Sequence, residues 1–460
     1  MIQGESPQRW AVVGGGFLGM TLALRLAQQG KSVTLFEAAA SLGGLASAWR
    51  LGDVVWDRHY HVTLSSDAKL RRLLQELGLD DGMHWATART GFYIDSKLHS
   101  MSNTLEFLKF PPLSIKDKFR LAATIFHASK IKDWKPLEKI PVKDWLESWS
   151  GSTVTQKIWL PLLRAKLGEN YLDTSAAFIW ATIARMYAAR RSGMKTELFG
   201  YVPGGYARII QQFEKLLCQE RVKCRLGQPV RSVVSTSFGK LRVEIGDGPP
   251  DEFDQVVVTI AAPLAERMCE QLTATEKKQL KRIKYQGIIC ASLLLKQPLS
   301  GFYITNITDS SVPYTAVIEM SALVERSYFG GHALVYLPKY VCSHSPAFDL
   351  SDQEIREQFL SGLDRMYPQF KREDVLCFQV SRVRYLLPIP TLGYSDELPQ
   401  MSTSIPGLHV INSAHIVNGT LNVNETVQLA DSAASGFAKQ FTPHHLSPRI
   451  PKHEFAEINR

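Results

Sequence analysis

Hydrophobic positions in the first forty residues follow a strand–helix–strand pattern. The apolar run at residues 10–13 predicts a short buried strand. Leucines recur every four residues over 18–26, which predicts one apolar helix face, and Gly30 is suited to end that helix. Residues 32–36 predict a second strand. This order indicates the start of an α/β domain.

The pattern continues as a mixture of helices and strands. It predicts helices over residues 66–79, 114–146, 157–191, 207–218 and 351–367. It predicts strands or hairpins over residues 49–56, 92–100, 228–233, 240–245, 254–260, 288–295, 302–306, 314–320, 333–337 and 375–384. At 460 residues the chain is long enough for two or three domains.

The loop between the first strand and its helix has the spacing G-x-G-x-x-G. Gly14 allows a tight turn, Gly16 lets a pyrophosphate approach the backbone, and Gly19 lets the helix pack close to the strand. Phe17 and Leu18 open the helix, whose free N–H groups favour phosphates. Because strand, helix and second strand surround the motif in the right order, it predicts a dinucleotide site rather than an ordinary glycine-rich turn.

Two further features follow the second strand. Glu37 can accept hydrogen bonds from both ribose hydroxyls and would repel a 2′-phosphate, so NADP is not expected. Gly43, Gly44 and Leu45 then form a second glycine turn, which a plain NAD domain does not need. Together these residues resemble the extended FAD fingerprint of the flavin amine oxidase and protoporphyrinogen oxidase superfamily, to which UDP-galactopyranose mutase is structurally related. The resemblance implies FAD as cofactor.

Three more stretches resemble motifs of that superfamily. Asp57 and His61 match D-x-G-x-H, where backbone and histidine line the flavin, but His59 stands where glycine is usual. The residue that the resemblance places against the adenine is Val230, and residues 201–206 resemble the P-x-G-G turn. His61 is the first candidate catalytic residue, because an unperturbed imidazole is suited to proton transfer.

The closing motif of the superfamily also has a counterpart here. Asn412 and Ser413 replace the usual Gly-Asp, so the resemblance assigns the ribityl hydrogen bonds to them. The following helix begins near Asn424 and Glu425, and its dipole is expected to face the flavin.

The resemblance implies an α/β architecture: a Rossmann-like FAD-binding domain of the GR2 type with an inserted α+β substrate domain. The FAD-binding domain is expected to be discontinuous, over residues 1–90, 200–284 and 395–442. Helices over 91–199 and a largely antiparallel sheet over 285–394 are expected to form the substrate domain. A loose tail is expected over 443–460.

Composition bounds the location of the protein and its partners. The chain is 45% hydrophobic and 21% charged, as in soluble globular proteins, and no apolar run is long enough to cross a membrane. No signal-peptide core opens the chain, so we expect a cytoplasmic protein. Six scattered cysteines without C-x-x-C argue against a metal site. The net charge of +9 favours anionic partners, but no nucleic-acid motif accompanies it.

Residues 110–145 interleave lysines with large apolar side chains. One interpretation is peripheral membrane contact; the favoured alternative is a solvated helix face over a core stripe. Five further cations are candidates for an anionic group of the substrate: Arg164, Lys166, Arg185, Arg190 and Arg191. The oligomeric state does not follow from the sequence.

Three functions remain open. The first is an FAD-dependent oxidoreductase that takes a hydride from a small or lipid-like substrate. The second is a mutase-like flavoprotein acting on a nucleotide sugar: residues 312–315 resemble a stretch of the galactopyranose mutases, which makes Tyr314 a second candidate catalytic residue, but Ala316 replaces their arginine. The third is a non-catalytic FAD-binding protein.

Overall fold

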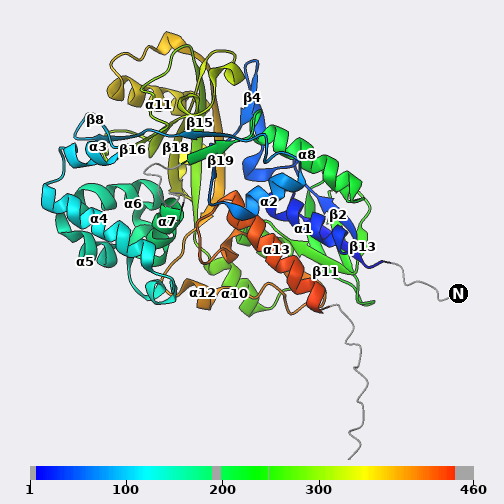
Figure 1. Cartoon of the computed structure of the whole chain (residues 1–460). Coiled ribbons are helices and arrows are strands. Elements are labelled where there is room, and N and C mark those ends of the chain that lie inside the picture. Colours follow the sequence, from blue (N-terminus) through cyan, green and yellow to red (C-terminus); the bar gives the residue numbers. More distant parts are fainter. Residues whose placement is uncertain (1–6, 189–197, 247, 441–460) are drawn as a thin grey trace, which may run out of the picture.

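The computed structural model describes residues 7–188, 198–246 and 248–440 (Figure 1). The tail expected over 443–460 lies outside these residues. Two of the cations considered for an anionic substrate group, Arg190 and Arg191, also lie outside them.

A five-stranded parallel sheet forms the centre of one half of the molecule. Its strands lie in the order β10 (Lys223–Arg225), β2 (Ser32–Phe36), β1 (Arg9–Val13), β14 (Gln255–Val258) and β20 (Leu408–Val410). Side chains alternate between its faces, so that Trp10 and Val12 enter one core while Ala11 and Val13 enter the other. Both faces are therefore buried, which explains why its strands read as continuous apolar runs.

Two different layers cover this sheet (Figure 1). One face is covered by four helices: α1 (Phe17–Gln28), α2 (Ala68–Glu76), α8 (Gly205–Gln219) and α13 (Val423–Gln440). The other face is covered by an antiparallel sheet and two helices: β11 (Val230–Ser235), β12 (Leu241–Ile245), β13 (Asp251–Phe253), α9 (Ala262–Met268) and α10 (Ala274–Arg282). The predicted strands at residues 10–13, 32–36 and 254–260 are confirmed as β1, β2 and β14.

A seven-stranded sheet forms the centre of the other half. Its order is β19 (Val375–Pro388), β15 (Tyr285–Leu295), β18 (Ala333–Cys342), β17 (Ala316–Glu319), β16 (Ile304–Ile307), β7 (Thr90–Ile94) and β8 (Lys97–Ser100). All pairs are antiparallel except β16 with β7. One face packs against α11 (Asp352–Met366), and the other turns toward the short strands of the first half.

A helical layer extends from this sheet at the left of Figure 1. It contains α3 (Thr104–Lys109), α4 (Ile115–Lys130), α5 (Val142–Val154), α6 (Leu160–Leu167) and α7 (Ala176–Ala188). The long helices expected over 114–146 and 157–191 are thus each interrupted. Pro136 and Pro141 lie in the first interruption, where they cannot continue a helix, and Gly168 ends α6 with a φ of +56°.

Short strands connect the two halves. The hairpin of β3 (Ala48–Leu51) and β4 (Val54–Asp57) leads directly into the segment that carries the candidate histidines. A small sheet then joins β5 (Thr63–Leu64), β9 (Leu198–Tyr201) and β6 (His84–Thr87). A short helix, α12 (Tyr394–Glu397), precedes the return of the chain to β20. The connections place residues 57–63 between the two large sheets.

Candidate active site

The first glycine turn is shaped by contacts that exclude side chains. Gly14 has a φ of +113°, and Gly16 is the N-cap of α1. A Cβ on Gly19 would lie 1.8 Å from the carbonyl oxygen of Gly14, so only glycine lets the helix pack this close to the turn. The backbone nitrogens of Phe17 and Leu18 open the helix beside this turn. The arrangement is the one that the G-x-G-x-x-G spacing predicts.

The second glycine turn lies against the first. The backbone nitrogen of Gly43 donates to the Gly15 carbonyl at 2.8 Å, and Gly43 bridges Gly16 in parallel register. A Cβ on Gly44 would lie 3.0 Å from the Cα of Gly16. Leu45 follows in a single 3₁₀ turn, Gly44–Ala46. Two loops that are separated by twenty-odd residues therefore form one cradle of bare backbone.

Glu37 lies at one end of this cradle. Its carboxylate accepts hydrogen bonds from the backbone nitrogens of Gly15, at 2.6 Å, and Ala39, at 2.8 Å. Its carbonyl accepts from the nitrogen of Gln228, two residues before Val230 at the start of β11. The structure therefore brings together the residues predicted for ribose and for adenine. Glycines along the cradle and an acidic group at its end fit a dinucleotide.

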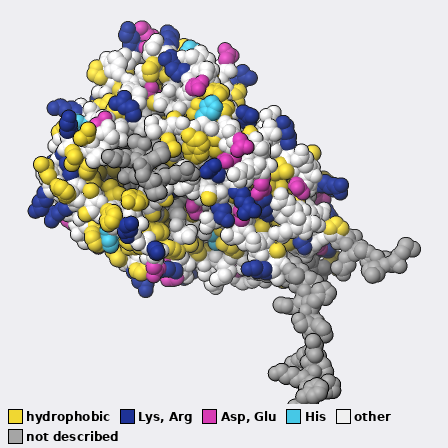
Figure 2. Space-filling model, in the orientation of Figure 1, with side chains coloured by type: hydrophobic (Ala, Val, Ile, Leu, Met, Phe, Trp, Pro, Cys, Tyr) yellow, Lys and Arg dark blue, Asp and Glu magenta, His cyan; other side chains and the backbone are white. Residues whose placement is uncertain are grey.

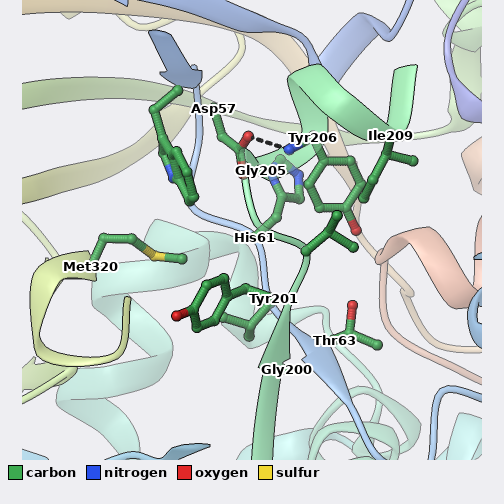
Figure 3. A pocket seen from close by; sticks show the side chains of 12 residues that line it. Asp57, His61, Thr63, Gly200, Tyr201, Gly205, Tyr206, Ile209 and Met320 are labelled. Carbon is green, nitrogen blue, oxygen red and sulfur yellow. Dashed lines mark hydrogen bonds between the residues drawn. The ribbon is translucent and has the colours of Figure 1, made fainter. Parts of the chain in front are cut away.

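Asp57 supports the neighbouring helix. Its carboxylate accepts from the backbone nitrogen of Tyr206 at 2.7 Å, in the first turn of α8 (Figure 3). A Cβ on Gly205 would come within 2.7 Å of the same oxygen, so the P-x-G-G glycine is needed for this contact. Burial raises the pKa of Asp57 to about 8, and the backbone donors offset only part of that rise. Asp57 thus fixes its loop against the start of α8.

His59 joins two distant elements. Its Nδ1 bonds the Leu45 carbonyl at 3.0 Å and must therefore carry the proton, which leaves Nε2 to accept from the Ser381 hydroxyl at 3.1 Å. Burial lowers the pKa of His59 to about 4. The imidazole that replaces the usual glycine therefore ties the second glycine turn to β19.

His61 lies beside the N-terminus of α8. Its Nδ1 donates to the His59 carbonyl at 2.9 Å, so Nε2 is the acceptor nitrogen of the neutral ring. Figure 3 shows the imidazole next to Tyr206, with ring centroids 4.8 Å apart. Burial lowers the pKa of His61 to about 4, which keeps it neutral near pH 7. Tyr206 in turn contacts Phe17 edge to face at 5.5 Å, so aromatic rings connect His61 to the first glycine turn.

A small cavity adjoins His61 (Figure 3). It is lined by apolar and aromatic side chains, among them Trp56, Tyr201 and Met320. Its volume for the centre of a water molecule is about 10 Å³, which is the space of a single water. This cavity is too small to hold a substrate.

The closing motif supplies unsatisfied donors. The Asn412 side chain accepts from the Ala414 nitrogen at 3.1 Å, but its Nδ2 is buried and has no hydrogen-bond partner among the described residues. Ser413, the next residue, lies near the Tyr285 hydroxyl. A buried amide without a partner costs free energy unless a ligand satisfies it. Asn412 therefore fits the hydrogen-bonding role that the resemblance gave it.

At the start of α13, the side chain of Asn424 bonds protein groups. Its side-chain oxygen accepts from the nitrogens of Lys69 and Leu70, at 2.9 and 3.1 Å, and so caps α2. Its Nδ2 donates to Glu425, whose pKa burial raises. The cap of α13 itself is Asn422, which accepts from the Glu425 nitrogen at 3.0 Å and which the sequence analysis did not single out. The side chain of Asn424 is thus directed to protein backbone.

Tyr314 is not brought to this cluster. It is buried in the core between the seven-stranded sheet and α11, edge to face with Phe359 at 5.4 Å. Its hydroxyl meets the Met366 sulfur at 3.6 Å. His61 lies in the segment between the two sheets, so the structure separates the two candidate catalytic residues.

The predicted cations have protein partners of their own. Arg185 forms an ion pair with Asp67 at 3.0 Å. Arg164 stacks over Tyr171, at 5.4 Å from the ring centre. Lys166 lies 5.5 Å from the ring centre of Tyr340, whose hydroxyl bonds that of Tyr60 at 3.0 Å.

Tyr60 and Tyr206 were not predicted as site residues. The available signals were their positions, one next to His61 and one directly after P-x-G-G. Within the described ranges, no group of three or more His, Cys, Asp or Glu side chains could hold a metal ion.

Comparison with known proteins finds a family model described as flavin containing amine oxidoreductase, which matches residues 19–435. Coproporphyrinogen III oxidase of Mycobacterium tuberculosis is 26% identical over 285 residues, which is 58% of this chain and 61% of that protein. The chain spans between 29% and 61% of the length of the first curated relatives that it matches.

Two solved structures show the same fold at low identity. An oxidoreductase from Methanosarcina mazei matches with a TM-score of 0.71 and 18% identity, over 93% of this chain and 100% of that chain. Reduced UDP-galactopyranose mutase matches with a TM-score of 0.71 and 14% identity, over 95% of this chain and 96% of that chain.

Proposed function

Because the chain belongs to the family of flavin-containing amine oxidoreductases, we propose that it transfers a hydride from a small or lipid-like substrate to bound FAD. FAD is the cofactor of this family, and oxidoreduction is its class of chemistry. The observation that carries the proposal is the contact between the two glycine turns beside Glu37. A second glycine turn at this place suits the longer flavin dinucleotide.

Each part of the cradle has a task in holding the cofactor. The first turn, residues 14–18, would hold the pyrophosphate, with the second turn beside it. Glu37 would accept from the ribose hydroxyls, and Val230 would lie at the adenine end. Asn412 and Ser413 would donate toward the ribityl chain. When bound, FAD supplies the acceptor for two electrons and a hydrogen.

His61 would act on the substrate as a hydrogen-bond acceptor. When a substrate C–H bond gives up its hydride, a neighbouring atom of the substrate releases a proton. The neutral imidazole offers Nε2 to that proton, while Nδ1 is fixed by the His59 carbonyl. The low pKa makes His61 a weak base, so its contribution is orientation and partial proton acceptance.

Contacts of Tyr60, the residue before His61, favour a substrate with an apolar body and an anionic group. Tyr60 and Tyr340 present paired hydroxyls, and Lys166 lies over the Tyr340 ring. The nucleotide-sugar mutase alternative has no such support, because Ala316 is buried where the mutases have arginine.

Anaerobic mixing of the holoprotein with an amine, a porphyrinogen, a polyene and UDP-galactopyranose tests the proposal. Loss of flavin absorbance with one of the first three supports hydride transfer. Turnover of UDP-galactopyranose only after prior flavin reduction would replace it with the mutase function. A flavin that none of the four classes reduces, in a protein without mutase turnover, would favour a non-catalytic flavoprotein.

A further inference from the structure

The outer face of α3 and α4 exposes large apolar side chains. Leu105 and Leu108 on α3 and Ile115, Phe119 and Phe126 on α4 are between 51% and 70% exposed. The three residues on α4 are spaced four and seven apart, so they lie on one face of that helix. The opposite face, with Leu121 and Ala128, packs into the helical layer.

Cations accompany these apolar side chains. Lys109, Lys116, Arg120 and Lys130 are all exposed on the same two helices. The two carboxylates of α3 and α4 are engaged by hydroxyl groups: Glu106 accepts from Ser100 and Asp117 from Ser114. Figure 2 shows hydrophobic and Lys/Arg side chains side by side over this end of the molecule. The face is both apolar and positively charged.

This face is held in place by its own contacts. The Lys118 ammonium donates to the Leu108 carbonyl at 2.7 Å and ties α3 to α4. Thr124 bonds Ser150 at 2.8 Å and ties α4 to α5. Asn103 and Ser114 cap the two helices. The face is therefore preformed, and little ordering entropy opposes its binding.

The residues of the stretch 110–145 that follow α4 do not share this exposed apolar face. Lys135 pairs with Asp396 and Glu138, and Trp145 and Leu146 are buried against α7. Its lysines therefore do not extend the apolar face. Over the described part of the chain, no helix is long and apolar enough to cross a membrane.

We propose that the α3–α4 face docks on the surface of an anionic phospholipid bilayer. Phe119 and Phe126 would enter the boundary between headgroups and acyl chains, where aromatic and aliphatic side chains of surface-lying helices are buried. Lys109, Lys116 and Lys130 would face the lipid phosphates. Charge complementarity selects a bilayer over a second copy of this chain, because two such faces would repel each other.

Sedimentation of the full-length holoprotein with vesicles tests the proposal. The vesicles contain phosphatidylcholine alone or with one-third phosphatidylserine. We expect binding to the anionic vesicles that weakens with added salt. The double variant Phe119→Ser/Phe126→Ser should bind more than tenfold more weakly, because two large apolar groups are lost. Neutralising one lysine, as in Lys116→Gln, should weaken the binding to anionic vesicles about fivefold.

Matched control variants distinguish binding through the α3–α4 face from nonspecific adsorption to vesicles. Phe238→Ser removes an 89%-exposed phenylalanine from the β11–β12 turn, and Lys215→Gln removes an exposed cation from α8. Both should bind like wild type, and all variants should keep their FAD. Failure of wild type to bind anionic vesicles would overturn the proposal. So would a concentration-dependent dimer that Phe119→Ser/Phe126→Ser abolishes, since it would assign the face to a second copy.

Discussion

At the scale of single residues, three buried histidines have lowered pKa values. Burial lowers the pKa of His59, His61 and His409 to about 4. In the unfolded chain each imidazole titrates near pH 6.5. Between pH 6.5 and pH 4 the unfolded state therefore binds more protons than the folded state at each of these sites. Each histidine contributes stability above pH 6.5 that is lost as the pH falls toward 4.

His409 allows this linkage to be measured away from the glycine cradle. Its Nε2 bonds the Gln255 side chain at 3.0 Å, and its Nδ1 meets the Ser402 hydroxyl at 3.1 Å. We predict that His409→Gln lowers the free energy of unfolding at pH 7.5 by about 1–2 kcal/mol. At pH 5 the difference should have moved by about 2 kcal/mol in favour of the variant, so that it closes or reverses, because only wild type loses stability when His409 is protonated in the unfolded chain. Denaturant titration at both pH values checks this, and an equal gap at both would contradict it.

His61 is the residue on which the proposed chemistry depends most. We predict that His61→Ala keeps most of its FAD but slows flavin reduction by the substrate at least tenfold, since proton-transfer groups typically contribute about 10²–10⁴-fold. Because its pKa is about 4, His61 should add no pH-dependent step near 6.5 to the wild-type rate. Stopped-flow absorbance measures both. His84→Ala, at an exposed position on β6, is the control. A rate within about threefold of wild type at full FAD occupancy would assign His61 to structure.

Glu37 tests the ribose end of the cradle. Glu37→Ala removes a carboxylate that also holds the nitrogens of Gly15 and Ala39. We predict weaker FAD binding by about 1–3 kcal/mol, the range for losing hydrogen bonds to a charged group. Glu37→Gln keeps one acceptor oxygen, so its FAD affinity should lie between those of wild type and Glu37→Ala. Equilibrium dialysis of flavin content measures the loss, with Glu252→Ala on β13 as the exposed control. Equal retention in all four proteins would remove Glu37 from the site.

Residue-level predictions succeeded where local spacing determines a role. The glycines of both turns and Glu37 lie together because a tight turn and a close backbone approach require glycine. Tyr314 was singled out by a short matching stretch, and such a match does not tell which core the side chain enters: Tyr314 lies in the bend before β17 and is buried against α11. The hydrogen bonds of His59 to Leu45 and Ser381 join three segments, and no local pattern indicates such a contact.

At the scale of elements, side chains from distant parts of the chain bind the first turns of two helices, α2 and α8. Asn424 belongs to the first turn of α13 but caps the N-terminus of α2. The sequence places this asparagine near a helix start, which is correct, but it does not show whose backbone it serves. The same holds for Asp57, which accepts from the nitrogen of Tyr206, 149 positions away, in the first turn of α8. The flanking glycine motif was the only local sign of that contact.

Asn424→Ala should therefore act through α2. We predict a loss of about 1–2 kcal/mol in the free energy of unfolding, as for removal of a helix cap. Asn103→Ala removes the cap of α3, whose side chain accepts from the Glu106 nitrogen at 3.0 Å. Both variants should lower the melting temperature, and both should bind FAD with near wild-type affinity. Strongly weakened FAD binding in Asn424→Ala alone would instead support a direct cofactor role for its side chain.

At the scale of the whole molecule, the parallel sheet is assembled from distant segments. β1 and β2 come from the first forty residues, whereas β10, β14 and β20 come from residues 223–410. Apolar runs predicted most of these strands. The three-residue strand β10 escaped prediction, because it is short and its first two residues are exposed. The pairing order depends on tertiary packing, which the hydrophobic pattern does not encode. The family resemblance supplied the overall architecture.

The proposed function requires FAD to lie where the two glycine turns meet. The most direct measurement is the FAD content per chain of wild type, Gly44→Ala and Gly52→Ala. The two glycines have φ values of +56° and +59°, so both substitutions impose similar backbone strain. A Cβ on Gly44 would lie 3.0 Å from the Gly16 Cα, whereas a Cβ on Gly52 meets nothing within 4 Å. We predict one acid-releasable FAD in wild type and Gly52→Ala and a large loss in Gly44→Ala. Full FAD in folded Gly44→Ala, or none in wild type, would contradict it.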